Sequence, residues 1–129
     1  MAYVDIVTGL ALLQFMVFGF RVSKARGRYE VAAPAVTGNE VFERYFRVQQ
    51  NTLELMVVLL PALYVFSHYF NPLIAAALGV IYLIGREIYS FTYVKAPKKR
   101  GLGYLLTALP VSVLIIGGLF GAIQQLAGH

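Results

Sequence analysis

The sequence predicts an all-α protein, an integral membrane four-helix bundle made by a single domain over residues 1–129. Of the 129 residues, 59% are hydrophobic and 13% are charged, whereas an average soluble domain is about 25% charged. Two long stretches, 6–20 and 101–129, contain no Asp, Glu, Lys or Arg. Uncharged stretches of this length are typical of helices that cross lipid.

Four apolar segments mark the expected helices, each near the roughly 20 residues that cross the hydrocarbon core. They lie at about 3–22, 48–68, 73–94 and 103–126. The first segment has no basic region before it and no small-residue cleavage site after it, so we expect a retained helix rather than a signal peptide. Turn-forming residues upstream of Glu40 predict that the second helix begins there.

Proline and glycine inside these segments predict how the helices pack. Pro61 and Pro110 predict kinks in the second and fourth helices. Gly117 and Gly121 have the GxxxG spacing, which allows another helix to approach closely.

The basic residues gather around the first and third connections, whereas the short connection at 67–72 has none. Basic connections favour the cytoplasm, so we expect both termini and the second connection on the opposite side. Only an even number of crossings allows this arrangement. We therefore expect a multi-pass protein of a bacterial inner membrane or the endoplasmic reticulum, with an up-down topology.

Composition argues against several classes of function. Cysteine is absent, which excludes disulfides and thiolate metal sites. The two histidines, His68 and His129, do not form a pair at matched depth that could hold a haem. The net charge of +5 comes without the aromatic-interleaved basic surface used to bind nucleic acid. We expect neither a bound metal nor a nucleic acid partner.

Two helical faces carry polar side chains at membrane depth, where an ionisable group costs about 2.5 to 3.5 kcal/mol on insertion scales. On the second helix, the positions i, i+4 and i+7 are Arg47, Asn51 and Glu54. On the third helix, the positions i, i+4, i+7 and i+11 are Tyr82, Arg86, Tyr89 and Tyr93. Together these faces predict a site for a small zwitterion rich in carboxylates.

A simpler interpretation of the same residues stays open. Glu54 and Arg86 could neutralise each other, and the tyrosines could form an aromatic belt at the membrane interface. That interpretation gives Arg47, Gln49 and Asn51 no role.

Two motifs carry a resemblance to a known family. Residues 42–54, FERYFRVQQNTLE, resemble the signature FERxxRAQxNxxE, with Val48 in place of its alanine. Residues 85–93, GREIYSFTY, followed by KKR at 98–100, resemble the segment R-x-x-Y-x-x-x-Y with a downstream arginine. Over nearly its full length the chain resembles the MAPEG family, the membrane-associated proteins in eicosanoid and glutathione metabolism. The likeness is to its branch of microsomal glutathione transferases and leukotriene C synthase.

The resemblance implies a homotrimer that binds glutathione between subunits, in clefts open toward the cytoplasm. It assigns thiol activation to Arg100. The residues that it assigns to glutathione binding are Arg26, Arg47, Gln49, Asn51, Glu54, Arg86, Tyr89 and Tyr93. The expected partners are glutathione, membrane lipid, and a lipophilic electrophile or a lipid hydroperoxide, so the expected activity is glutathione transfer with possible peroxidase activity.

Two departures and two competing functions remain. Leu55 and Gly27 replace a tyrosine and an arginine of leukotriene C synthase, which argues against a leukotriene substrate.

A non-enzymatic lipid-binding or scaffolding member of the family is the main alternative, and Arg100 argues against it. A small multidrug exporter also has four helices and one membrane glutamate, but it would not need the polar partners around Glu54.

Overall fold

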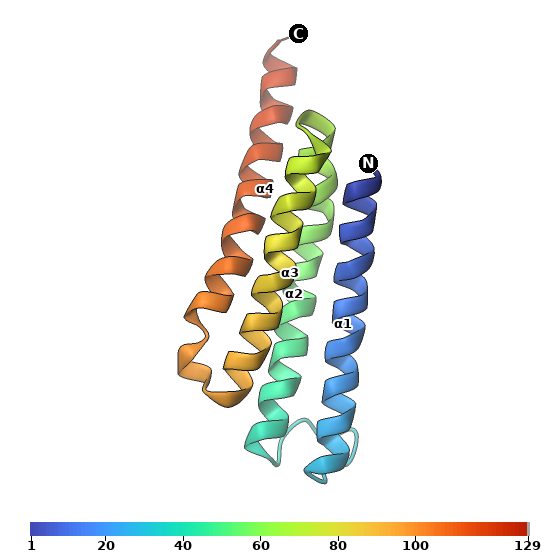
Figure 1. The fold of residues 1–129 in the computed structure, drawn as a ribbon, viewed down its shortest axis with the longest axis vertical. Helices are drawn as coiled ribbons and strands as arrows, with labels where there is room; N and C mark the ends of the chain where they lie inside the picture. The colour runs from blue at the N-terminus through green and yellow to red at the C-terminus, as the bar shows by residue number, and fades with distance from the viewer. Residues whose placement is uncertain (129) are drawn as a thin grey trace.

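The computed structural model describes residues 1–128, and the sequence prediction that names His129 lies outside them. The elements are α1 (Ala2–Arg28), α2 (Glu40–Tyr69), α3 (Pro72–Lys95), the 3-10 turn η1 (Pro97–Lys99) and α4 (Gly101–Ala127) (Figure 1). Each of the four α-helices is long and apolar enough to cross a membrane, and no strand occurs in residues 1–128. The expected all-helical fold with four membrane-length helices is confirmed.

The sequence explains where α2 and α3 begin. Oδ1 of Asn39 accepts a hydrogen bond from the backbone N–H of Phe42 at 2.9 Å, so Asn39 caps the first turn of α2. Asn71 does the same for the N–H of Leu73, also at 2.9 Å, and Pro72 then occupies the first helical turn, where no N–H is needed. The second helix therefore starts at Glu40, as expected.

The first helix is longer than its apolar segment. It continues from the expected end near residue 22 to Arg28 through a polar stretch, RVSKARGR at 21–28. Hydropathy detects only the part of a helix that suits lipid, so polar helical turns at its end are missed.

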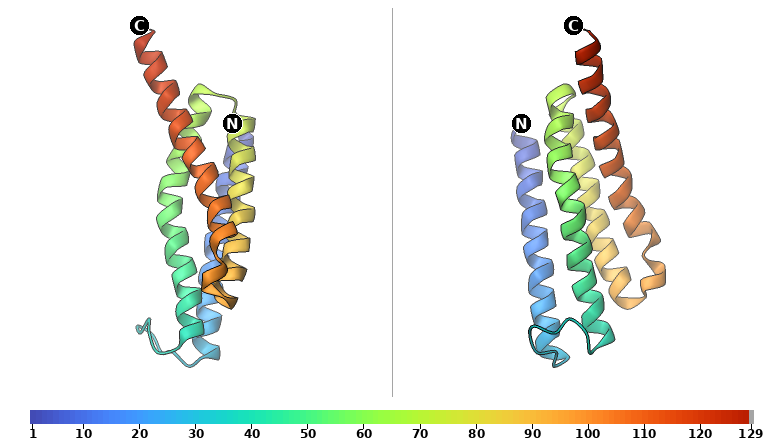
Figure 2. Two further views of the ribbon diagram at one scale, coloured as in Figure 1. Left: turned by 90° about the vertical axis from the view of Figure 1, so that its left-hand side faces the viewer. Right: turned by 180° about the vertical axis from the view of Figure 1, so that it is seen from behind.

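The helices lie side by side along one long axis, with both chain termini toward the same end of the bundle (Figures 1 and 2). The turn between α2 and α3 lies toward that end as well. The two longer connections, at 29–39 and 96–100, both lie toward the opposite end, on different sides of the bundle (Figures 1 and 2). This end carries most of the basic residues, and we call it the basic end.

Helix α1 packs on α2 and α3, and α4 packs on α2 and α3 as well. The shared core between the helices includes Val4, Leu59, Leu63 and Leu114, each with 0% exposure. Gly117 and Gly121 lie directly against α2: an added Cβ would stand 2.6 Å from the Phe66 ring and 2.5 Å from Cβ of Tyr69. The predicted close helix contact is confirmed, and Pro61 and Pro110 both lie inside continuous helices.

The outer surface is strongly apolar. Large side chains such as Met16, Val57 and Ile116 are 72%, 67% and 67% exposed. A soluble monomer rarely exposes so much apolar surface, whereas lipid tails cover it at no cost. The chain is therefore a multi-pass membrane protein by its fold.

Candidate functional site

The centre of the candidate site is the buried guanidinium of Arg86, which has 0% exposure. Its Nη2 donates to Oδ1 of Asn51 at 3.0 Å and to Oγ1 of Thr52 at 2.9 Å. Its Cζ lies 4.3 Å from the centre of the Tyr89 ring. Arg86 of the polar face on α3 therefore meets Asn51 of the polar face on α2.

Arg86 also keeps unused hydrogen-bond donors. Its Nε and Nη1 are buried and have no partner within residues 1–128, and the same holds for the hydroxyl of Tyr82. Buried donors without partners are costly and are uncommon in folded proteins. Such donors are suited to a ligand that brings acceptor oxygens.

On α2, Arg47 and Glu54 form an ion pair, with Nη1 and Oε1 3.7 Å apart. Their side chains are 55% and 62% exposed, so both remain accessible from outside the subunit. The simpler interpretation, in which Glu54 neutralises Arg86, is wrong, because Glu54 pairs with Arg47 instead. The aromatic-belt part of that interpretation also fails for Tyr82 and Tyr89, which are buried at 0% and 4% exposure.

Tyr89 connects the polar residues of three helices. Its ring stacks on that of Tyr93, with centroids 5.4 Å apart, and lies 6.5 Å from the ring of Tyr104. The guanidinium of Arg86 lies against the same ring, and Arg86 in turn bonds to Asn51 of α2. Residues from α2, α3 and the start of α4 are thus brought to one region near the basic end.

A glycine places α4 beside Tyr89. An added Cβ on Gly103 would lie 2.4 Å from the backbone N and 2.5 Å from Cα of Tyr89, so only glycine permits this approach. Arg100 precedes Gly103 by less than one helical turn, is exposed, and donates from Nη1 to the carbonyl of Pro97 at 3.0 Å. The packing of Gly103 on α3 therefore sets where Arg100 stands.

Two predicted residues are not brought to this region within the chain. Arg26 lies over the Phe42 ring at 4.8 Å and donates to the carbonyls of Val31 and Ala35 at 3.2 and 2.7 Å, which holds the first connection in place. Gln49 points toward α1, where a Cβ on Gly19 would lie 2.9 Å from its Nε2. Two helical positions separate it from Arg47, so the two side chains leave α2 in nearly opposite directions.

Sequence reasoning missed Thr52, Tyr104 and Gly103. Thr52 follows Asn51 directly, but a threonine inside an apolar helix has no feature that distinguishes it from a packing residue. It becomes recognisable only once the register between α2 and α3 is known. Tyr104 and Gly103 follow Arg100 closely, so extending the helical pattern backward from the fourth segment could have identified them.

Comparison with known proteins identifies the family of the chain. The sequence matches the profile of the MAPEG family over residues 4–120. An uncharacterized protein of Synechocystis is 43% identical over 121 residues, which are 94% of this chain and 88% of that protein. Microsomal glutathione S-transferase 2 of Homo sapiens is 39% identical over 115 residues, or 89% and 78% of the two chains. Leukotriene C4 synthase of Cavia porcellus is 35% identical over 94 residues, or 73% and 63%. The chain belongs to the MAPEG family.

Proposed function

We propose that this protein is a membrane-bound glutathione transferase, which activates the thiol of glutathione and joins it to lipophilic electrophiles. The observation that carries the proposal is the guanidinium of Arg86, whose buried Nε and Nη1 have no partner within residues 1–128 and whose partner Asn51 lies about one helical turn from both Arg47 and Glu54 on α2. Similarity to microsomal glutathione S-transferase 2 supports it. A tripeptide with two carboxylates and an ionising thiol calls for three cationic partners, and we assign these roles to Arg47, Arg86 and Arg100.

Each charged group of glutathione has a counterpart in the site. The unused Nε and Nη1 donors of Arg86 are suited to one carboxylate, and Arg47 is suited to the other. Glu54 would take the ammonium group, while Asn51 and Tyr93 supply hydrogen bonds. Breaking the Arg47–Glu54 pair costs about 1 kcal/mol or less, because an exposed ion pair contributes little.

Arg100 is assigned to the chemical step. A free thiol titrates near about 8.5, and lowering that value by about 2 units requires roughly 2.7 kcal/mol of preferential stabilisation of the thiolate. A single guanidinium beside the sulfur can supply this in a partly dry site. The thiol proton passes to solvent, and the sulfur then attacks an electrophilic carbon, forming an S–C bond while the leaving group departs with its electron pair.

Arg26 and Gln49 fit the proposal if a neighbouring copy supplies them. Their positions away from the Arg47–Glu54 pair lead us to place the site between subunits of a homotrimer, open toward the cytoplasmic side of an up-down bundle. Coexpression tests this. Arg47→Ala and Gln49→Ala chains, each weak alone, should regain part of their activity in mixed trimers, because some interfaces then contain both native residues. No recovery in mixed trimers would argue that one chain holds the whole site.

The main test is an activity measurement on the purified protein in detergent. With glutathione and a chlorodinitrobenzene electrophile, we expect saturable conjugate formation with release of chloride. A parallel assay with a lipid hydroperoxide measures peroxidase activity by the same thiolate. Glutathione binding without turnover in either assay would favour the lipid-binding or scaffolding alternative instead.

A further inference from the structure

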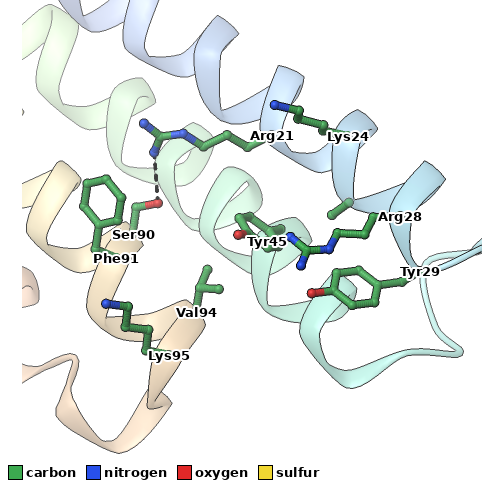
Figure 3. A pocket seen from close by; sticks show the side chains of 10 residues that line it. Arg21, Lys24, Arg28, Tyr29, Tyr45, Ser90, Phe91, Val94 and Lys95 are labelled. Carbon is green, nitrogen blue, oxygen red and sulfur yellow. Dashed lines mark hydrogen bonds between the residues drawn. The ribbon is translucent and has the colours of Figure 1, made fainter.

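A cavity lined by cations lies at the basic end, and none of Arg47, Arg86 and Arg100 lines it. Its volume is about 380 Å³, and it opens between α1, α2 and α3 (Figure 3). No carboxylate lines it. The cations that line it are Arg21, Lys24, Arg28 and Lys95, and the aromatic residues are Tyr29, Tyr45 and Phe91.

One of the four cations holds the helices together. Arg21 of α1 pairs with Glu87 of α3 at 3.2 Å and donates to Oγ of Ser90 at 3.2 Å. Its guanidinium also lies 5.2 Å from the centre of the Phe18 ring and 5.4 Å from that of Phe91. Arg21 therefore bridges α1 and α3 at the inner end of the cavity.

The other three cations have no counter-charge. Lys24, Arg28 and Lys95 form no ion pair with any carboxylate in residues 1–128. Arg28 lies over the Tyr29 ring at 5.6 Å and extends into the cavity (Figure 3). Three like charges around one hollow repel one another, and an anion held between them would remove that repulsion.

An apolar groove continues from this cavity toward the middle of the bundle. Phe91 lines both hollows. The remaining apolar lining comes from Leu10, Leu13, Val17, Leu83, Ile84 and Ile88. The groove also has two polar lining residues, Gln14 and Glu87; the carboxylate of Glu87 is paired with Arg21 and accepts a hydrogen bond from Gln14. On α1 the lining residues follow helical spacing through Leu10, Val17, Arg21 and Arg28, so the groove and the cavity occupy one continuous face.

The groove is open on its outer side. Leu13 is 63% exposed, Ile84 is 54% exposed and Phe91 is 59% exposed. Because the four helices are membrane-length, this apolar part faces hydrocarbon while the basic part stands near the membrane surface. A soluble anion would fill the cavity but leave the groove uncovered. A molecule with an anionic head and an apolar tail matches both.

We propose that the α1–α3 seam is a specific site for an anionic phospholipid. Its phosphate would lie among Lys24, Arg28 and Lys95, and one acyl chain would lie along the groove below Phe91. Arginine and lysine both bind phosphate well, the first with a planar fork and the second as a point charge. The proposal does not depend on transferase activity, because none of Arg47, Arg86 and Arg100 lines this seam.

The absence of tryptophan from the chain provides the test. Phe91→Trp places a single tryptophan, which can be excited selectively over the tyrosines, where the cavity meets the groove. The protein is reconstituted in phosphatidylcholine bilayers that contain a brominated lipid, which quenches tryptophan on contact. At equal mole fraction, we expect dibrominated phosphatidylglycerol to quench severalfold more effectively than dibrominated phosphatidylcholine.

Two double variants, each lacking two lysines, supply the control. Lys24→Gln with Lys95→Gln should abolish the preference for phosphatidylglycerol. Lys98→Gln with Lys99→Gln removes the same charge from the same end of the bundle, outside the cavity, and should leave the preference intact. If both double variants lost the preference for phosphatidylglycerol equally, general surface charge would explain the preference, and the proposed site would be wrong.

Three further outcomes would contradict the proposal. Equal quenching by the two lipids would show no headgroup specificity. No quenching by either lipid would show that another copy of the chain covers the seam. Displacement by glycerol 3-phosphate would show that a soluble anion suffices. Native mass spectrometry gives the same comparison without Phe91→Trp. It measures how much phosphatidylglycerol stays bound to the unsubstituted protein and to each of the two double variants.

Discussion

Arg86 donates a hydrogen bond to Oδ1 of Asn51 across the contact between α3 and α2, with an N–O distance of 3.0 Å. The same nitrogen also reaches Thr52. A buried guanidinium without acceptors would strongly destabilise the bundle, so these two bonds fix the register of the helices. They also leave Nε and Nη1 of Arg86 free for a ligand.

Asn51→Ala should therefore affect both folding and binding. It removes one of the acceptors of Arg86, so we expect unfolding to become easier by about 1 to 3 kcal/mol and glutathione to bind more weakly. Thermal unfolding in detergent, with and without glutathione, measures both effects. Gln50→Ala removes an adjacent amide from α2 and serves as the control, with little change expected. An unchanged unfolding midpoint in Asn51→Ala would show that Thr52 alone satisfies Arg86.

Exchanging the charges of Arg47 and Glu54 separates binding from stability. The double variant Arg47→Glu with Glu54→Arg keeps an ion pair that is more than half exposed, so the unfolding midpoint should stay close to that of the native protein. The ligand, however, would meet reversed charges, and we expect glutathione affinity to fall at least tenfold, or about 1.4 kcal/mol. Calorimetric titration measures the affinity. Native affinity in the exchanged protein would remove this pair from the site.

Much of the fold follows directly from the sequence. The four apolar segments locate the four helices, and the turn-forming residues before Glu40 indicate where α2 begins. The stripe through Arg86 and Tyr89 predicts a buried polar face, because ionisable groups avoid lipid. These features depend on residues close together in the chain, so periodicity and turn chemistry are enough to detect them.

The pairing of charges could not be predicted in the same way. From the sequence, Glu54 could pair equally well with Arg86 or with Arg47. A helical pattern shows which residues share a face, but it does not give the rotation of one helix against another. The close contact of Gly103 with Tyr89 decides how α4 sits, and it depends on three-dimensional approach. Basic residues such as Lys24 and Lys95 were explained by topology alone, which hid the cavity that they share.

Gly103→Ala should destabilise the protein and lower its activity. The added Cβ would meet backbone atoms of Tyr89 at 2.4 and 2.5 Å, and these cannot move aside as a flexible side chain can. We expect a loss of about 1 to 3 kcal/mol in unfolding free energy and a lower turnover, because Arg100 shifts with α4. Gly101→Ala is the matched control, because nothing lies within 4 Å of its added Cβ. Equal midpoints for the two variants would contradict close packing at Gly103.

Topology can be tested with reporter fusions. A reporter after residue 129 and one within 67–72 should both signal from the non-cytoplasmic side, because these regions lack basic residues. A reporter inserted in the first connection, at 30–38, should signal from the cytoplasm. A cytoplasmic signal from either of the first two fusions would contradict the four-crossing arrangement.

The most direct test of thiol activation is the ultraviolet absorbance of the thiolate while glutathione is titrated into purified protein at a series of pH values. We expect bound glutathione to ionise about 2 pH units below the usual value of about 8.5. Arg100→Ala should leave binding largely intact, raise the apparent pKa of the bound thiol, and reduce turnover about tenfold for each 1.4 kcal/mol of lost stabilisation. Arg100→Lys should recover part of the effect, and Lys99→Ala, which removes a neighbouring charge, should change neither quantity. If Arg100→Ala has the thiolate titration and the turnover of the native protein, the assignment of Arg100 to the chemical step is wrong.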